Sequence, residues 1–463
     1  MPPALRWLLA AASFGFVVVQ LDVTIVNVAL PRIGADLHTG VAGLQWIVDA
    51  YTLAFAVLLL SAGILGDKFG SKRAYLAGFA LFFVSSLACG VAVSGSMLVA
   101  ARAFQGLGAA LLVPSSLALI NHAFGHDRRL RARAIGIWTA CSALGIASGP
   151  VIGACLLQLF GWRSIFFVNL PLCLIGAWLT RRAVPGRESG AANHPLDPVG
   201  QILAIVFLTS LVGAVIEFRP LGGGHPVVIG GFIAALASGA IFVVAEARAR
   251  APMLPLDFFK LPNFSVATAF GVLVNITYYG VIFVISLYLQ QVRGFSVMAT
   301  GLAYLPLTAT FIVSNLTSGY VADRAGARRL MVIGALLGLT GFALLSRLGP
   351  DSSFAAMLPP FMIIPFGMGL AVPAMTSAVL AAAPSDRSGA ASAVLNTARQ
   401  SGGAIGVAIF GALASGGPAH VTVGLHRAAL ISVGLLGAAV ILGSLMRVTV
   451  PVAGDLVKDR AAG

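Results

Sequence analysis

Three ionisable side chains lie within long apolar stretches of this sequence: Asp22, Asp49 and Arg102. Charged groups are costly inside a bilayer and usually serve a function there. Desolvation disfavours an ionised carboxyl group, whereas an approaching cation favours it, so a buried carboxyl group can exchange a proton for a substrate. We expect Asp22 and Asp49 to take part in such proton coupling, and Arg102 to pair with a carboxylate or helical carbonyls. The structural alternatives are a helix-end hydrogen bond for Asp22 and, for Arg102, a side chain that reaches toward water.

The composition of the chain indicates where these residues lie. Of its 463 residues, 59% are hydrophobic and 10% are charged, whereas about a quarter of the residues in a soluble domain are charged. We therefore expect an all-α integral membrane protein. A crossing helix needs about 20 apolar residues, and we find at least twelve such runs and assign about fourteen. The assigned spans are 6–30, 42–65, 74–94, 97–120, 132–157, 164–180, 199–217, 227–245, 264–290, 299–320, 329–347, 354–378, 391–413 and 426–446.

Most of the 29 Lys and Arg residues fall on one side of these spans. The positive-inside rule assigns that side, and both chain termini, to the cytoplasm. Arg102 is the basic residue that we place within a span, while Arg399 is counted with the basic loops. The net charge of +14 therefore reflects membrane topology, and we expect no nucleic-acid partner.

A short acidic and basic segment occurs twice, 256 positions apart. The first copy is GILGDKFGSKR at 63–73 and the second is GYVADRAGARR at 319–329. The expected conformational gate comprises Gly63, Asp67, Gly70, Lys72, Arg73, Asp323, Gly326 and Arg328. Gly70 permits a tight turn, and Asp67 can face the positive end of a neighbouring helix. Any short cytoplasmic loop also favours Lys and Arg, but a repeat between apolar helices in both halves is typical of a duplicated transporter.

Two polar stretches, 181–198 and 246–262, divide the chain. Between them lie two apolar runs that have no counterpart elsewhere in the sequence. We therefore expect an N-terminal six-helix bundle over 1–182, a linker with two inserted helices over 183–262, a C-terminal six-helix bundle over 263–448 and a cytoplasmic tail over 449–463.

Four segments resemble motifs of the major facilitator superfamily, and in particular of its fourteen-helix drug:proton antiporter branch. They are LDVTIVNVALP at 21–31, the segment 63–73, LVAARAFQGLGAA at 98–110 and GIASGPVIGA at 145–154. The second departs from the family pattern at Gly66, Lys68 and Ser71, and the fourth at Ala154. The resemblance implies that Arg102 acts on a nearby acid in proton transfer and that the segment 63–73 is a latch between the halves.

The fourth segment is similar to the antiporter motif, which goes with exporters. It consists of Gly145, Gly149, Pro150 and Gly153. On packing grounds alone, its glycines predict a close helix–helix contact and Pro150 a bend. The stretch 396–403, which contains Arg399, also occurs in this branch, where it implies packing and gating.

Polar and aromatic residues within the spans are candidates for a substrate cavity. They are Asn27, Trp46, Tyr51, Gln105, Trp138, Asn275, Tyr278 and Tyr279. Tyr and Trp are equally common at the membrane–water interface. Glu217 is expected to form a surface salt bridge with Arg219. The spans after residue 260 contain no carboxylate, which argues against dication specificity.

These observations together predict a proton-coupled exporter of small amphipathic or cationic drug-like molecules, working by alternating access. The alternative is a dedicated exporter of an endogenous metabolite, antibiotic or lipid. A membrane enzyme is disfavoured because the seven histidines are scattered, and a channel because the repeat suits rocking motion. No ATP-binding loop occurs, so we expect no cofactor and a proton gradient as the energy source. We expect no metal site, a monomer among membrane lipids, and a multi-pass protein of a bacterial plasma membrane.

Overall fold

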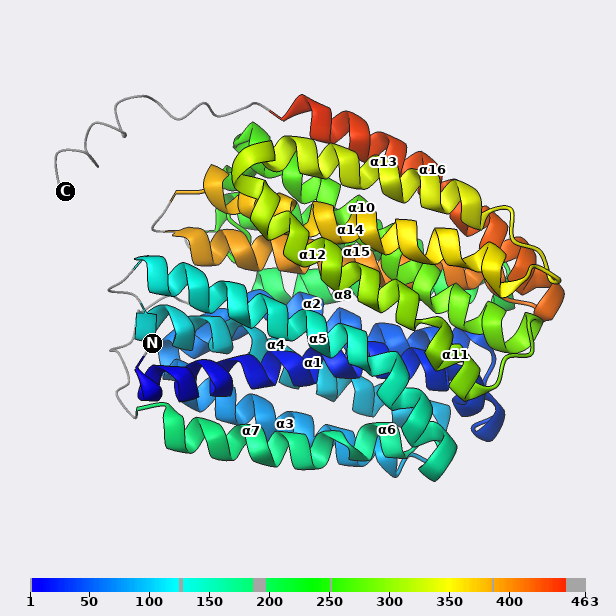
Figure 1. Ribbon diagram of the computed structural model, residues 1–463, viewed down its shortest axis with the longest axis horizontal. Coiled ribbons are helices and arrows are strands. Elements are labelled where there is room, and N and C mark those ends of the chain that lie inside the picture. Colours follow the sequence, from blue (N-terminus) through cyan, green and yellow to red (C-terminus); the bar gives the residue numbers. More distant parts are fainter. Residues whose placement is uncertain (1, 125–127, 186–196, 250–251, 385–386, 447–463) are drawn as a thin grey trace.

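The computed structural model describes residues 2–124, 128–185, 197–249, 252–384 and 387–446. The helices run roughly parallel to one another along the long axis of the molecule (Figure 1). The described residues form helices and short connections and no strand. Among the described residues, thirteen helical stretches are long and apolar enough to cross a membrane, and the 27-residue helix over Ser388–Ala414 is long enough to be a fourteenth. The predicted all-α membrane fold is confirmed.

The first six crossings come from seven helices, because one crossing is broken at Val168. They are α1 (Pro3–Asp36), α2 (Val41–Phe69), α3 (Ser71–Gly90), α4 (Gly95–Phe124), α5 (Arg128–Phe160), α6 (Ser164–Phe167) and α7 (Asn169–Ala183). Helices α8 (Pro198–Leu221) and α9 (Pro226–Arg248) follow. The remaining elements are η1 (Leu256–Lys260), α10 (Pro262–Leu287), η2 (Tyr288–Val292), α11 (Val297–Ala303), α12 (Leu305–Ala325), α13 (Ala327–Leu345), α14 (Phe354–Ala382), α15 (Ser388–Ala414) and α16 (Pro418–Leu445).

The two copies of the repeated segment form the same kind of turn. Gly70 separates α2 from α3 with φ 92°, and Gly326 separates α12 from α13 with φ 77°. Glycine adopts these positive φ values without the steric cost that other residues meet. The predicted tight turn at Gly70 is therefore confirmed. We call the end of the molecule that holds these two turns the basic end, after the Lys and Arg residues beside them; α1 begins there and α16 finishes there (Figure 1).

Each half contains a helix pair that is brought together by glycine. Helix α1 packs along α5, and α10 packs along α15. A methyl group on Gly145 of α5 would lie 2.8 Å from the carbonyl oxygen of Val17, and one on Gly402 of α15 would lie 2.8 Å from that of Val272. The duplication visible in the two turns therefore extends to backbone-to-backbone helix packing, as expected where small residues let helices approach.

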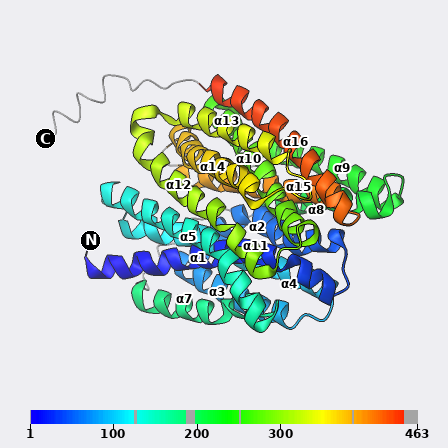
Figure 2. The same cartoon turned by 45° about the vertical axis from the view of Figure 1, so that its right-hand side comes forward.

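Helix α8 packs against α2 and α15, and α9 packs against α8. Helix α9 lies at the edge of the bundle (Figure 2). It exposes large apolar side chains such as Ile233, Leu236 and Ile241, as a lipid-facing helix should. Because α2 and α15 contact each other across the two halves, the domain boundaries at 182 and 263 stay a prediction.

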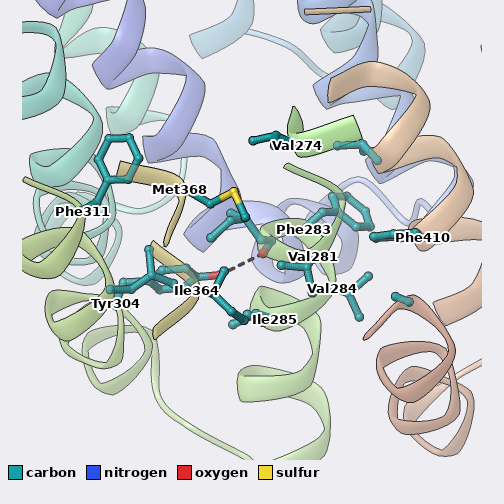
Figure 3. Packing of buried hydrophobic residues seen from close by; sticks show 14 of the residues in the cluster. Val274, Val281, Phe283, Val284, Ile285, Tyr304, Phe311, Ile364, Met368 and Phe410 are labelled. Carbon is teal, nitrogen blue, oxygen red and sulfur yellow. Dashed lines mark hydrogen bonds between the residues drawn. The ribbon is translucent and has the colours of Figure 1, made fainter. Parts of the chain in front are cut away.

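The apolar core of the second half surrounds α10. Figure 3 shows Val281, Phe283 and Val284 of this helix among side chains from neighbouring helices, including Met368 and Phe410. The hydroxyl of Tyr304, at the break between α11 and α12, donates to the carbonyl of Ile282 at 3.0 Å. This bond fixes the broken crossing against α10.

Candidate functional site

Asp22 and Arg102 form a buried ion pair in the first half. Arg102 Nη1 donates to Asp22 Oδ2 at 2.5 Å, and the two residues are 1% and 0% exposed. Arg102 Nε donates to the carbonyl of Ile47 at 3.2 Å. Its guanidinium also lies 4.3 Å from the centre of the Tyr51 ring. The expected partners of Arg102, a carboxylate and a helical carbonyl, are both present.

Two amides complete the surroundings of Asp22. Gln105 Nε2 and Asn169 Nδ2 donate to Asp22 Oδ1 at 2.9 Å and 2.8 Å. Gln105 also accepts from Arg102 at 2.6 Å and donates to Ser86 at 2.7 Å. Every polar contact of this carboxylate thus comes from a donor, which suits its ionised form. Sequence reasoning missed Asn169 and Ser86. The available signal was Asn169 itself, an amide within the apolar run 164–180.

Asp49 is equally buried but has no partner. It is 0% exposed, and neither carboxyl oxygen makes a hydrogen bond. It lies one turn after Gln45, on the same face of α2. Gln45 Nε2 donates to the carbonyls of Val407 and Ala408 on α15 at 3.2 Å and 2.7 Å. The unpartnered acid therefore lies next to a polar contact between the two halves.

Further polar contacts join the halves away from the basic end. Ser286 Oγ donates to the carbonyl of Asn27 at 2.5 Å, and Gln290 Nε2 donates to the carbonyl of Val28 at 3.0 Å. Together with Gln45, these residues close the opposite end of the bundle. We call these three contacts the seal.

Toward the basic end lies a cavity of about 290 Å³, which we call the vestibule. Its lining comes from α2, α4, α5 and α15 and includes Gly63, Pro114, Trp138 and Asn396. Trp138 is held by a hydrogen bond to Ser116 at 3.0 Å and by stacking on Phe16. The vestibule is therefore formed by both halves.

A second, small cavity of about 30 Å³ lies deeper, between α1, α5, α10 and α12. Asn27, Tyr278 and Tyr279 are among the residues that line it, together with Pro150 and Tyr304. Three of the predicted cavity residues thus come together here. Asn275 is buried and donates to the carbonyl of Gly271 at 2.7 Å.

The remaining predicted cavity residues have other surroundings. Tyr51 and Gln105 belong to the Asp22–Arg102 network. Trp46 lies against α8, where its indole donates to Glu217 Oε1 at 3.0 Å. The expected salt bridge between Glu217 and Arg219 is therefore wrong, because the carboxylate turns toward Trp46 of α2.

The predicted gate residues do not form one cluster. Gly63 lines the vestibule, Arg328 is exposed, and Lys72 Nζ donates to the carbonyl of Val184 at 2.5 Å. Lys72 thus ties the start of α3 to the end of α7. Arg73 is likewise engaged in an interaction with another group. The side chains of Asp67 and Asp323 lie outside the described part of the structure, so their gating role stays a prediction.

The predicted antiporter motif contacts both α1 and the second half. A methyl group on Gly149 would clash with the Thr24 side chain and lie 3.0 Å from the Ile25 nitrogen; one on Gly153 would lie 3.0 Å from the Ile25 carbonyl oxygen. Across the halves, a methyl group on Gly301 of α11 would lie 2.9 Å from the carbonyl oxygen of Pro150. The described residues contain no group of His, Cys, Asp or Glu placed to hold a metal ion.

A duplicated helical bundle with a buried acid–guanidinium pair, a seal at one end and a vestibule at the other defines a membrane transporter. A family model described as Major Facilitator Superfamily matches residues 12–407. The chain belongs to this superfamily.

Three relatives show where in the superfamily the similarity lies. The chain is 36% identical to the methylenomycin A resistance protein of Bacillus subtilis, over 95% of this chain and 92% of the relative. It is 37% identical to the multidrug resistance protein Stp of Mycobacterium tuberculosis, over 88% and 75%. It is 34% identical to the multidrug efflux pump LfrA of Mycolicibacterium smegmatis, over 89% and 81%.

Proposed function

We propose that this protein is a proton-coupled exporter of small amphipathic molecules that works by alternating access. The printed names of its relatives, which include a multidrug efflux pump and antibiotic resistance proteins, support export of drug-like compounds. The bacterial sources of these relatives and the placement of Lys and Arg support a bacterial plasma membrane with the basic end in the cytoplasm.

The observation that carries the proposal is the contrast between the two buried acids. Asp22 has a guanidinium and two amide donors, whereas Asp49 has neither a cation nor a donor. An ionised carboxylate in such surroundings is costly unless it is paired. Asp49 therefore favours its protonated form in this conformation, whereas Asp22 is paired with Arg102.

The seal and the vestibule suggest when that proton moves. With the seal closed, the vestibule gives access from the basic end, from which substrate enters. Opening of the seal around Gln45 exposes Asp49 to the other side of the membrane, where it takes up a proton as substrate leaves. Closing of the seal buries the protonated Asp49 again, as in the conformation described here. In our proposal the proton then leaves toward the cytoplasm before the seal next opens.

A dedicated exporter of an endogenous antibiotic shares this mechanism and differs in substrate range. This alternative is supported by the name of a further relative. The chain is 35% identical to the tetracenomycin C resistance and export protein of Streptomyces glaucescens. Growth of a pump-deficient strain that expresses the chain, measured against a panel of dyes, biocides and antibiotics, separates the two functions. A broad resistance profile supports drug export, and resistance to one compound class supports the dedicated exporter.

The coupling step is tested in proteoliposomes with a compound from that panel. Asp49→Asn should abolish accumulation driven by a proton gradient while substrate exchange without a gradient continues. Asp257→Asn, which alters an exposed acid, is the matched control and should behave as wild type. Full gradient-driven transport by Asp49→Asn would refute the assignment of the proton to this residue.

A further inference from the structure

Arg399 lies within α15 and within the predicted span 391–413, and not in one of the basic loops with which it was counted. It is the twelfth residue of the 27-residue helix α15, which places it about 16 Å from the start of the helix at 1.5 Å per residue. This is about half the thickness of a bilayer core. The assigned span 391–413 contains Arg399, so its place among the basic loops was inconsistent with that span.

Arg399 has no counter-charge. Its Nε atom is buried without a hydrogen-bond partner, and no hydrogen bond or ion pair joins its guanidinium to the described residues. The predicted spans after residue 260 contain no Asp or Glu, and the described residues of this half include no buried acid. Guanidinium groups stay protonated in proteins, and an unpaired charge at this depth is costly and marks a functional site.

The contrast with Arg102 is informative. Both are arginines within crossing helices, but Arg102 is satisfied by Asp22, Gln105 and a carbonyl. A structural role for Arg399 would require similar partners. The described residues supply no such partner, which leaves the guanidinium available to a bound molecule.

Arg399 is not itself a lining residue of either cavity, but residues one helical turn away lie beside each of them. Asn396 precedes it by one turn on the same side of α15 and lines the vestibule. Gly403 follows by one turn, and a methyl group there would lie 3.2 Å from the Tyr279 ring. Tyr279 lines the deeper cavity. The stem of Arg399 rests on Gly271 of α10.

We propose that Arg399 binds an anionic group of the transported molecule, namely a carboxylate. The planar guanidinium can hold both carboxylate oxygens through parallel hydrogen bonds. The apolar body of the substrate then lies beside Tyr278 and Tyr279, which present aromatic faces next to the deeper cavity. This inference rests on the proposed transport function and narrows its substrate class from amphipathic molecules in general to amphipathic acids.

The test compares each of several acids with its own ester, so that only the anionic group differs. A suitable panel contains rhodamine B and its ethyl ester, together with hydrophobic carboxylic acids and their methyl esters. Binding to the purified full chain in detergent is measured as the rise in apparent Tm with ligand concentration, because a ligand of the folded state stabilises it. At least one acid should bind at least tenfold more tightly than its ester. Failure of every acid to bind, or equal binding of acid and ester throughout, would overturn the proposal.

Variants at Arg399 then assign the preference to this residue. Arg399→Gln should remove the preference for the acid, and Arg399→Lys should retain part of it. An ester that binds the wild type should bind each variant as well, and this binding shows that the variant remains folded. Arg219→Gln, which removes a positive charge from an exposed position, is the matched control and should keep the preference. A preference that survives Arg399→Gln would contradict the assignment. The binding assay uses no proton gradient, so it tests the preference for acids separately from proton coupling. A failure of proton-driven transport would count against the proposed function but would not change the binding result.

Discussion

Arg102 of α4 donates to Asp22 of α1 at 2.5 Å in a site that solvent does not reach. This ion pair joins two helices that are far apart in the sequence. Arg102 also binds the carbonyl of Ile47 on α2, and Asn169 brings α7 to the same carboxylate. Four of the first seven helices thus meet at one charge pair, which makes it a structural junction.

Removal of one charge of this pair should be more harmful than removal of both. Asp22→Asn leaves the Arg102 guanidinium buried without a counter-charge, and such changes cost about 3–5 kcal/mol. We expect a marked fall in the apparent Tm of the purified protein. The double variant Asp22→Asn/Arg102→Gln removes the uncompensated charge and should be more stable than Asp22→Asn alone. A double variant that loses the sum of the two single effects would show that the residues do not interact.

The closeness of α1 and α5 depends on Gly149. A methyl group at this position would collide with Thr24 and approach the Ile25 backbone, so Gly149→Ala must push the two helices apart. Overpacking of this kind costs about 1–3 kcal/mol. Gly136→Ala on the same helix is the matched control, because no atom lies within 4 Å of the added carbon. It should leave the apparent Tm unchanged or raise it, since alanine favours helix; similar losses for both variants would contradict this account.

The contact between η1 and the start of α15 should contribute little. Arg387 donates to Asp257 at 2.6 Å, but the two side chains are 39% and 55% exposed. The hydrogen bond from Arg387 lowers the pKa of Asp257 below its ordinary value of 3.8. Any stabilisation is therefore present above about pH 4 and lost as the pH falls through the lowered pKa. Asp257→Asn should change stability by less than about 1 kcal/mol at neutral pH, and less again in high salt. A larger loss in thermal unfolding would show that the pair holds the linker in place.

The fold could be predicted from the sequence further than the site could. Hydropathy and the positive-inside rule depend only on how deep a residue lies along the membrane normal, so they locate whole helices well. For example, the predicted span 354–378 falls within α14 (Phe354–Ala382). Breaks such as those at Val168 and Tyr304 were not predicted, because the residues around them are as apolar as those of a continuous helix.

Side-chain partners depend on how each helix is rotated about its axis, which a hydropathy profile does not record. Trp46 and Tyr51 were assigned to one cavity, yet Trp46 lies against α8 and Tyr51 against Arg102. The pairing of Arg102 could be anticipated because its charge demanded a partner. The same reasoning was not applied to Arg399, since it was counted with the loops.

The final prediction concerns the seal at the end opposite the basic turns. Gln45 is buried, and its amide binds two carbonyls of α15; a methyl group on Gly411 would also lie 2.6 Å from Gln45. Gln45→Ala removes both hydrogen bonds between the halves and should shift the population toward a state that is open at this end. Spin labels at Arg32 and Asp351, which are exposed residues of the two halves, report that opening as a longer distance component in pulsed electron paramagnetic resonance.

Gln201→Ala is the matched control, because it removes a hydrogen bond to the carbonyl of Val57 between α8 and α2 and leaves the seal intact. An unchanged distance distribution in Gln45→Ala would show that Ser286 and Gln290 hold the seal without it.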